Sequence, residues 1–346
     1  LQIMIQLQQR ISAFNRLGDF LRNINSENSD YKSLFDTVSR AKDNNGWFSK
    51  ENVIHALNAW GNLLNKKDLI QWTKDYIFEN EEPKIVGLVL AGNIPLVGFH
   101  DVLSVLISGN KVLVKCSSSD PLLIAFLVQK LQEIEPGFKD LVEFTKERFT
   151  HFDAVIATGS NNAARYFEYY FSKVPNLIRA NRNGVAVLDG NETKEQLEAL
   201  AQDVVRYFGL GCRSTSKVFV PVGYDLNLIF GALYPFDSLM DSAKYANNYD
   251  YNKAVYLMSQ FDLLDNGFFM LKEDESYTSP VACLHYEYYS DYKNLEEKLK
   301  LDQDLIQCIT SNQKGKSHFE FGKAQQPNLW DYADGKNTLH FLNILT

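Results

Sequence analysis

The sequence lacks the features of several common classes of protein. Only four of its 346 residues are cysteines, and no two of them form a CxxC pair or stand at the spacing of zinc ligands. Scattered cysteines of this kind indicate free thiols in a reducing compartment, so we expect a cytoplasmic protein without a bound metal. No continuous apolar run approaches the ~18 residues of a membrane span, so we also expect no membrane span.

Positive charge is scarce too. Lys and Arg together number 35 against 43 Asp and Glu, which gives a formal net charge of −8 at pH 7. No dense run of basic residues offsets this deficit. Because nucleic acids and anionic membranes attract basic surfaces, the balance argues against a nucleic-acid partner and favours a small-molecule substrate.

The fingerprints of the ordinary nucleotide-binding folds are missing as well. The chain contains neither G-x-G-x-x-G nor the phosphate-binding loop G-x-x-x-x-G-K-[ST]. Any cofactor site must therefore be inferred from other features.

The hydrophobic pattern divides the chain near Pro83. Residues 1–82 carry apolar side chains at helical spacing, which predicts an all-helical leader without chemistry of its own. After Pro83, residues 84–91, 111–115 and 153–157 are apolar runs typical of buried parallel strands, with helix-like segments between them. Strands that alternate with helices predict an α/β fold with a doubly wound parallel sheet, whose ligands bind at the carboxyl ends of the strands.

Cys212 is the strongest candidate for a catalytic group. Gly209 and Gly211 precede it, and such glycines leave room for a substrate carbonyl to approach a thiolate nucleophile. Arg213 and Lys217 add positive charge, which is expected to lower the pKa of the thiol. The alternative is that Cys212 is a small buried hydrophobic residue, as most free cysteines are.

Four motifs resemble those of the aldehyde dehydrogenase superfamily and occur in the same order. They are Gly92-Asn93-Ile94-Pro95, Val114-Lys115-Cys116-Ser117-Ser118, Ala157-Thr158-Gly159-Ser160 and Gly209-Leu210-Gly211-Cys212, with Leu210 where the superfamily usually has Gln. The tail, residues 321–345, resembles the C-terminus of the LuxC-type acyl-CoA reductases. The resemblance covers nearly everything after Pro83. It implies an aldehyde-dehydrogenase-like fold, with doubly wound parallel sheets in a cofactor domain and a catalytic domain.

The resemblance also implies a role for each motif. Cys212 would be the nucleophile, and Asn93 would donate a hydrogen bond to the developing oxyanion. Lys115 would hold the adenosine ribose of the cofactor. Gly159 and Ser160 would face its pyrophosphate.

The same resemblance points to NADPH as the cofactor. Relatives that use NAD carry Glu three residues after the lysine, where this chain has Ser118. The change removes a carboxylate that would repel a 2′-phosphate, and Ser117 offers a further hydroxyl. For the nicotinamide ribose, the superfamily's carboxylate position is occupied by Ser276. Glu275 is adjacent, and which carboxylate fills this role, if any, stays open.

One superfamily feature is absent. Aldehyde-oxidising relatives carry a Glu that activates the hydrolytic water, but residues 176–184 contain no carboxylate. An acyl-enzyme is therefore expected to survive long enough to be reduced. Arg179 and Arg182 lie there instead, either as phosphate ligands or as solvated surface charges.

We expect four parts along the chain. They are a helical segment (1–82), an NADP(H)-binding domain (83–183), a catalytic domain with Cys212 (184–320) and a C-terminal return (321–346). The resemblance also implies a final strand that joins the sheet of a neighbouring subunit. Residues 339–345 are mostly apolar and contain no Lys, Arg, Asp or Glu. Because an apolar strand left uncovered at a terminus would tend to aggregate, we expect a homodimer.

The function implied is NADPH-dependent reduction of an acyl-CoA, with a fatty acyl group as one candidate, to the aldehyde through an acyl-Cys212 intermediate. Two alternatives are an aldehyde-oxidising NAD(P) dehydrogenase and an acyl-phosphate reductase. A further alternative, from another functional class, is an enzyme fold that has lost its activity and serves as a scaffold.

Overall fold

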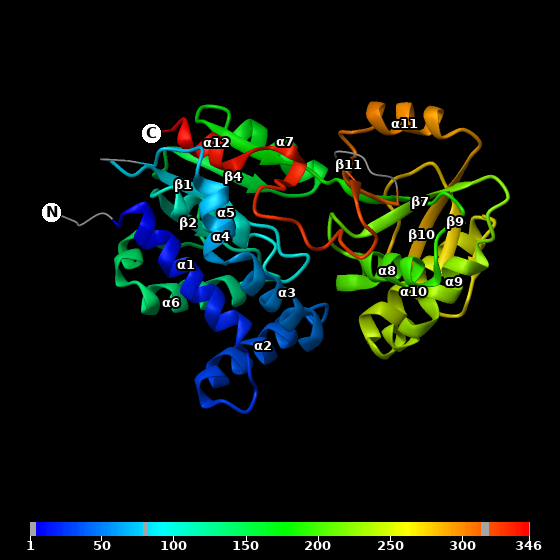
Figure 1. The fold of residues 1–346 in the computed structure, drawn as a ribbon, viewed down its shortest axis with the longest axis horizontal. Helices are drawn as coiled ribbons and strands as arrows, with labels where there is room; N and C mark the ends of the chain where they lie inside the picture. Colours follow the sequence, from blue (N-terminus) through cyan, green and yellow to red (C-terminus); the bar gives the residue numbers. More distant parts are fainter. Residues whose placement is uncertain (1–4, 79–81, 313–317, 346) are drawn as a thin grey trace. The chain divides into compact units, whose positions relative to one another are not determined.

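The structure is a computed structural model that describes residues 5–78, 82–312 and 318–345. It contains two compact units, each built around one β-sheet (Figure 1). The first unit comprises Leu1–Ala180 and Asn328–Thr346, and the second comprises Asn181–Pro327. The chain therefore leaves the first unit after residue 180 and returns to it at residue 328.

The first unit contains a parallel sheet with the strand order β3-β2-β1-β4-β5. The strands are β1 (Ile85–Val89), β2 (Lys111–Lys115), β3 (Val142–Phe144), β4 (Ala154–Thr158) and β5 (Asn176–Arg179). The chain passes from β1 to β2 on one side and later to β4 on the other, so the order reverses beside β1. Open parallel sheets bind ligands at such a switch point, outside the carboxyl ends of the strands.

Three α-helices connect these strands: α5 (Phe99–Ile107), α6 (Leu123–Ile134) and α7 (Asn161–Tyr170), with a 3₁₀ turn η2 (Pro136–Leu141) before β3. The leader adds α1 (Leu7–Arg22), η1 (Ser29–Tyr31), α2 (Lys32–Asn44), α3 (Lys50–Leu63) and α4 (Lys66–Thr73). Its aromatic side chains pack on the sheet unit. The ring centroids of Phe14 and Phe138 lie 5.6 Å apart, and those of Trp60 and Phe99 lie 4.9 Å apart. The leader is therefore part of the core of the first unit. In the described ranges, no helix has the length and apolar content needed to cross a membrane.

The described residues of the second unit form a seven-stranded sheet with the order β12-β11-β6-β7-β10-β9-β8, parallel except for the pair β8 and β9. The strands are β6 (Asn183–Val187), β7 (Thr215–Pro221), β8 (Leu264–Asp265), β9 (Met270–Glu273), β10 (Cys283–Tyr289), β11 (Ile306–Ser311) and β12 (His318–Phe319). The helical segments are α8 (Lys194–Val205), η3 (Arg206–Gly209), α9 (Asn227–Leu233), η4 (Tyr234–Asp241), α10 (Ala243–Met258) and α11 (Tyr292–Leu301).

Helices cover both faces of this second sheet. Figure 1 shows α11 on one face and α8, α9 and α10 on the other. On the α11 face, Leu295 and Leu299 pack with Val185, Val187 and Phe219 of β6 and β7. Both units therefore have the doubly wound arrangement that the alternating pattern predicts.

The tail differs from the expected final strand. Residues 339–345, expected to be extended, lie mostly in a helix, α12 (Thr338–Asn343), which follows the 3₁₀ turn η5 (Ala333–Gly335). The side chain of Asn337 caps this helix by accepting the N–H of His340 at 2.9 Å, and Leu339 and Leu342, three residues apart, are buried together on one face. In the described tail this segment therefore offers no strand edge to a neighbouring subunit. The prediction of a homodimer was based on such a strand and no longer has that support.

Candidate active site

The turn that carries Asn93 packs directly on the loop after β2. Asn93 is exposed in the turn that follows β1, and the neighbouring Gly92 touches Ser117. A Cβ atom added at Gly92 would lie 2.6 Å from the Cβ of Ser117 and 2.7 Å from its hydroxyl. Only a glycine permits this approach, so the sequence Gly92-Asn93 places the predicted oxyanion donor beside the predicted cofactor loop.

Asp120 fixes the relative position of these two loops. This carboxylate is 2 % exposed and accepts the backbone N–H of Leu96 at 3.0 Å and that of Leu123 at 3.3 Å. Leu96 lies in the turn after β1 with a φ of 60°, and Leu123 begins α6. Burial raises the pKa of Asp120 to about 6. The sequence analysis missed this residue, although an Asp directly before Pro121 at a helix start is a recognisable signal.

The leader supports the cofactor loop. Ser118 and Ser119 are exposed, and their backbone oxygens accept hydrogen bonds from the side-chain amides of Asn44 at 3.1 Å and Asn45 at 3.3 Å. These two asparagines end α2 and begin the following turn. The leader, predicted to be helical and without chemistry of its own, therefore supports the loop that carries Ser118.

The remaining cofactor candidates lie at the carboxyl end of β4. Ser160 is the N-cap of α7, and its Oγ accepts the backbone N–H of Ala163 at 3.3 Å. A Cβ atom at Gly159 would lie 2.8 Å from the Cβ of Ala163, so a glycine is needed for the strand to enter the helix here. The N-terminus of a helix at a switch point is suited to a phosphate. In the first unit, Lys115, Ser117 and Ser118 thus lie on one side of β1, and Gly159 and Ser160 on the other.

In the second unit, Cys212 lies in a turn that is closed at both ends. The backbone N–H of Ser214 donates to the oxygen of Gly211 at 2.9 Å, and the N–H of Gly211 donates to the Oγ of Ser214 at 3.2 Å. The thiol-bearing residue is half-buried at this turn. None of the four cysteines is in a disulfide. The two hydrogen bonds hold Cys212 in one backbone conformation.

The backbone leading to this turn is strained. Tyr207 and Phe208 have φ values of 55° and 57°, a region that side chains with a Cβ rarely adopt, and Gly209 follows at 75°. Both aromatic side chains are buried, and Phe208 packs on Tyr245 with 6.1 Å between ring centroids. Their packing offsets a backbone cost of about 1–3 kcal/mol per residue. Strain of this kind is typical of functional segments.

Gly184 at the start of β6 lies against the back of the Cys212 turn. A Cβ there would lie 2.6 Å from the oxygen of Arg213 and 2.7 Å from that of Ser214, where the pairing of β6 with β7 shifts register. Cys308 of β11 donates its thiol hydrogen to the same Arg213 oxygen, with 3.8 Å between sulfur and oxygen. The turn therefore packs on the amino-terminal parts of β6 and β11, and position 184 has no room for a side chain.

A returning loop holds the other side of the turn. Gln325 donates its side-chain amide to the Oγ of Ser214 at 2.9 Å. Asp203 of α8 accepts the backbone N–H of Gly322 at 2.7 Å and of Ala324 at 3.1 Å. Desolvation by burial raises the pKa of Asp203 to about 7. Sequence reasoning missed Asp203, because its partners lie more than a hundred residues away in the chain.

The charges near Cys212 differ from expectation at Lys217. Its ammonium is fully buried, pairs with the Glu287 carboxylate at 2.5 Å and donates to the backbone oxygen of Glu275 at 2.7 Å. Burial lowers its pKa, and Glu287 balances its charge. Lys217 is therefore committed to a buried ion pair and is not the open cation that was expected to activate the thiol. Arg213 stacks on the Phe319 ring, with 5.2 Å from its guanidinium carbon to the centroid.

Arg179 is also corrected by the structure. Its guanidinium is 4 % exposed, donates to both carboxylate oxygens of Asp101 at 2.8 Å and donates to the Oγ1 of Thr338 at 2.7 Å. It therefore ties β5 to α5 and α12, and is neither a phosphate ligand nor a solvated charge. Arg182 contacts the Gln303 oxygen at 3.2 Å and Asp304 at 3.4 Å, as a surface ion pair does.

The remaining candidates are the other three cysteines and the residues expected near the nicotinamide ribose. Burial raises the pKa of Cys283 and Cys308 to about 12 and that of Cys116 to about 11, which makes them poor nucleophiles. Glu275 and Ser276 are exposed in the turn after β9. Among the described residues, no group of three His, Cys, Asp or Glu side chains is arranged to hold a metal ion.

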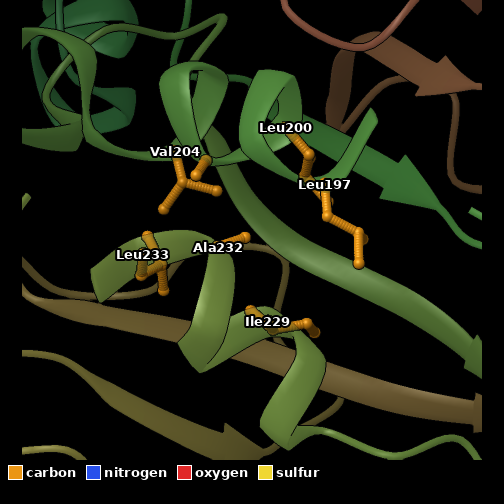
Figure 2. Close-up of a pocket in the computed structure, with 7 residues that line it drawn as sticks. Leu197, Leu200, Val204, Ile229, Ala232 and Leu233 are labelled. Carbon is orange, nitrogen blue, oxygen red and sulfur yellow. The ribbon is translucent and has the colours of Figure 1, made fainter. Parts of the chain in front are cut away.

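An apolar pocket lies between α8 and α9 (Figure 2). Its lining consists of Leu197, Leu200, Ala201, Val204, Ile229, Ala232 and Leu233. The lining contains no charged or polar side chain, so the pocket offers nothing to a phosphate or to a reacting carbonyl. Its Val204 end is close to the strained segment, because a Cβ at Gly209 would lie 3.3 Å from the Val204 oxygen.

Comparison with known proteins decides the family. The model of the family described as acyl-CoA reductase (LuxC) matches residues 27–228, a range that includes Asn93, Lys115, Gly159 and Cys212. The chain belongs to this family. The resemblance seen in the motifs is thereby confirmed.

Relatives of the LuxC family chain include two curated proteins named long-chain acyl-protein thioester reductase. The one from Aliivibrio fischeri is 24% identical over 247 residues, which cover 64% of this chain and 47% of the relative. The one from Vibrio harveyi is 25% identical over 146 residues, which cover 38% of this chain and 31% of the relative. The match thus spans about half the length of these relatives or less.

Solved structures show the fold. Aldehyde dehydrogenase 21 from Physcomitrella patens has a TM-score of 0.68 at 11% identity. The match covers 99% of this LuxC family chain and 84% of the dehydrogenase chain. The aldehyde dehydrogenase KauB from Pseudomonas aeruginosa has a TM-score of 0.63 at 14% identity, covering 90% and 73%. The predicted aldehyde-dehydrogenase-like fold is therefore confirmed.

Proposed function

We propose that this chain reduces an acyl thioester to the aldehyde through an acyl-Cys212 intermediate, with NADPH as the reductant. The observation that supports this most is the Cys212 turn. Cys212 is half-buried and follows a strained segment. It lies in a turn that is closed by two hydrogen bonds and packs on Gly184, in a chain whose family is described as acyl-CoA reductase. A cysteine that served only to fill space in the core would not need a strained approach and a hydrogen-bonded turn to fix its position.

The chemistry assigned to the chain begins with acyl transfer. The Cys212 thiolate attacks the thioester carbonyl, the tetrahedral oxyanion forms, and the donor thiolate leaves as the Cys212 thioester closes. Asn93 and the backbone N–H of Cys212 are the proposed donors to the oxyanion. NADPH, when bound, supplies the hydride that takes the thioester to the aldehyde. Collapse of the second oxyanion then breaks the carbon–sulfur bond and returns the Cys212 thiolate.

Several features of the first unit fit NADPH. Lys115, Ser117 and Ser118 lie at the carboxyl end of β2, and Gly159 and Ser160 at the start of α7, on either side of the switch point at β1. The close approaches at Gly92 and Gly159 shape the edge on which a dinucleotide would lie. Ser118 is exposed and carries no negative charge that would repel a 2′-phosphate.

The acyl donor has two candidates. Acyl-CoA agrees with the description of the family, whereas the curated relatives are named for acyl-protein thioesters. Both donors present the same thioester to Cys212, so the proposed chemistry holds for either. We propose acyl-CoA as the donor and treat an acyl-protein as the alternative to be compared.

Product identity tests the proposed function. Acyl-CoAs of graded length and an acylated carrier protein would be incubated with the chain and NADPH, followed by measurement of free thiol, NADPH oxidation, aldehyde and acid. We expect one thiol released and one aldehyde formed per NADPH oxidised. Free acid as the main product, without NADPH oxidation, would mean that water hydrolyses the acyl-enzyme, the step that completes aldehyde oxidation, and would favour the aldehyde-oxidising alternative. No thiol release from any donor would contradict the proposal and favour a retired scaffold.

A further inference from the structure

Helix α10 of the second unit (Figure 1) carries apolar side chains on two different faces. Tyr245 and Tyr249 are buried in the unit. Tyr251, Val255 and Met258 follow at intervals of four and three residues, which places them together on another face of the helix. A surface helix normally has one apolar stripe, so the second stripe indicates that another surface covers it.

The second apolar face of α10 is exposed in the single chain. Tyr251 is 68 % exposed and Met258 is 85 % exposed, and Val255 between them is exposed as well. Leu257 and Phe261 add two further exposed side chains at the end of the helix. Single apolar residues are common on protein surfaces, whereas a contiguous group of this kind marks an interaction site.

The chain leaves α10 in a fixed direction. Gln260 has a φ of 57°, and the N–H of Phe261 donates to the Tyr256 oxygen at 3.2 Å. The rings of Phe261 and Tyr256 pack with 6.0 Å between their centroids. A left-handed residue, this hydrogen bond and this apolar contact together form a Schellman motif, which ends the helix. Asp262 is the next residue and is exposed, so it lies just beyond the C-terminal end of α10.

The two ends of the exposed face carry opposite charges. Lys244 is exposed in the first turn of α10, two helical turns before Tyr251 and on the same face. Asp262 follows the other end. Two such helices that pack antiparallel place the cation of each beside the anion of the other, whereas parallel packing would bring like charges together. The face is therefore complementary to itself, as the contact surface of a two-fold dimer must be.

We propose that α10 is the contact between two copies of this chain, packed antiparallel about a two-fold axis. Tyr251 then lies against Val255 of the partner subunit, and Lys244 lies beside Asp262 of the partner subunit. Both pairs are centred on position 253 of the helix, so a single axis satisfies them together. The net charge of −8 argues against an anionic lipid surface as the partner. The inference is independent of the proposed function and gives the homodimer a surface other than a terminal strand.

The oligomeric state at a series of concentrations tests this interface. A face ~24 Å long and ~10 Å wide is smaller than the ~800 Å² that each partner buries in a standard interface. We therefore expect a dimer that dissociates on dilution, which sedimentation velocity follows from about 1 to about 100 μM. Tyr251→Ser removes an aromatic anchor, and Val255→Asp buries an unpaired carboxylate. Each is expected to raise the dissociation constant by about tenfold or more, with the thermal unfolding midpoint as the check that the fold is intact.

Exchange of the two charges tests the antiparallel arrangement. Lys244→Glu and Asp262→Lys each bring like charges together at both ends of the two-fold interface. Each is expected to weaken the dimer by about three- to tenfold at low ionic strength, and the effect should shrink in high salt. The variant with both changes should dimerise nearly as the wild type does, because opposite charges meet again. A double variant as weak as the single ones would contradict the antiparallel contact.

Tyr169→Ser is the matched control, because Tyr169 is a strongly exposed tyrosine on α7 in the first unit. It should leave the dissociation constant unchanged. A dimer that is lost in Tyr169→Ser would place the interface on the first unit and overturn the inference. A monomer over the whole concentration range, or α10 variants that associate as the wild type does, would overturn it as well.

Discussion

At the scale of single residues, Cys212 differs from the other three cysteines in its surroundings. Cys283 and Cys308 are buried with raised pKa values, and Cys116 has a raised pKa in a half-buried loop, whereas Cys212 occupies a turn held by hydrogen bonds. We predict that Cys212→Ala abolishes both adduct formation and turnover and leaves cofactor binding nearly unchanged. Intact mass measures adduct formation, aldehyde production measures turnover, and nucleotide calorimetry measures cofactor binding.

Cys116→Ala serves as the control for this substitution, because it removes a half-buried thiol from the loop that bears Ser117. It should retain adduct formation. An acyl group that maps to Cys116, Cys283 or Cys308 would contradict the assignment of the nucleophile.

The absence of a general base yields a second prediction at this scale. The positions that could carry a water-activating carboxylate are 178, 179 and 180, and the structure separates them. Ile178 and Arg179 are buried, and Arg179 is held by Asp101, whereas Ala180 is exposed. Ala180→Glu is therefore the variant expected to speed hydrolysis of the acyl-enzyme, by about tenfold or more for a positioned base. Release of free acid from the isolated adduct measures it.

Ala180→Gln is the matched control, with the same shape and no base. If the two variants release acid at the same rate, position 180 does not reach the acyl group. Rapid acid release by the unmodified chain would show that another residue supplies the base.

At the scale of structural elements, the account depends on how tightly β6 meets the Cys212 turn. Gly184→Ala places a Cβ 2.6 Å from the Arg213 oxygen, so either the turn or the strand must move. We predict a loss of about 1–3 kcal/mol in the free energy of unfolding and a slower acylation of Cys212. Denaturant unfolding and the rate of adduct formation measure the two effects.

Gly231→Ala provides the comparison for this variant. Gly231 lies within α9 with no atom within 4 Å of the added Cβ. It should acylate at the wild-type rate and be as stable as the wild type or slightly more stable, because alanine favours a helix. Equal acylation rates for the two glycine variants would indicate that the turn does not need the close approach of β6.

The link between α8 and the returning loop predicts a dependence on pH. Burial raises the pKa of Asp203 from 3.8 to about 7, so the folded chain holds its proton more tightly than the unfolded chain does. Asp203 therefore makes the free energy of unfolding fall as pH rises from about 4 to about 7, and adds no further change above that range. Asp203→Asn lacks this titration.

Thermal unfolding of both proteins between pH 5 and 8 checks this prediction. The variant should gain stability relative to the wild type as pH rises, by at most a few kcal/mol since one pKa unit corresponds to about 1.4 kcal/mol. Asparagine has one side-chain oxygen where the carboxylate has two. The substitution therefore also removes one hydrogen-bond acceptor, which changes the free energy of unfolding by the same amount at every pH. A constant difference between the two proteins over the whole range would contradict the raised pKa.

The elements also show what a sequence can and cannot predict. β1, β2 and β4 were predictable because each is a continuous apolar run followed by a turn motif, and local sequence decides that pattern. Arg179 and Lys217 were misjudged because their partners are remote. Asp101 and Thr338 lie 78 and 159 residues from Arg179, and Glu287 lies 70 residues from Lys217.

The tail was misjudged for a related reason. The apolar residues 339–345 fit a strand by composition, and the helix is decided by the Asn337 cap and by burial of one face in the first unit. The support that Asn44 and Asn45 give to the serine loop is likewise a tertiary contact. The composition and spacing of residues do not predict such tertiary contacts.

At the scale of the whole molecule, the chain presents its two sets of candidate residues on separate units. Asn93 and the cofactor candidates belong to the first unit, and Cys212 belongs to the second. The aldehyde-dehydrogenase-like fold applies to the chain as a whole. The match to the LuxC family model covers residues 27–228. A cytoplasmic location stays a prediction from the sequence, and the homodimer is proposed on the basis of α10.

The most direct test of the central claim is a two-step mass measurement. The chain is first mixed with acyl-CoA in the absence of NADPH, and its intact mass is followed. We predict a stoichiometric acyl adduct that maps to Cys212 and is absent from Cys212→Ala. NADPH added to the isolated adduct should then restore the unmodified mass and form one aldehyde per adduct. An adduct that NADPH does not discharge, or the failure of both acyl-CoA and an acyl-protein to acylate Cys212, would contradict the account.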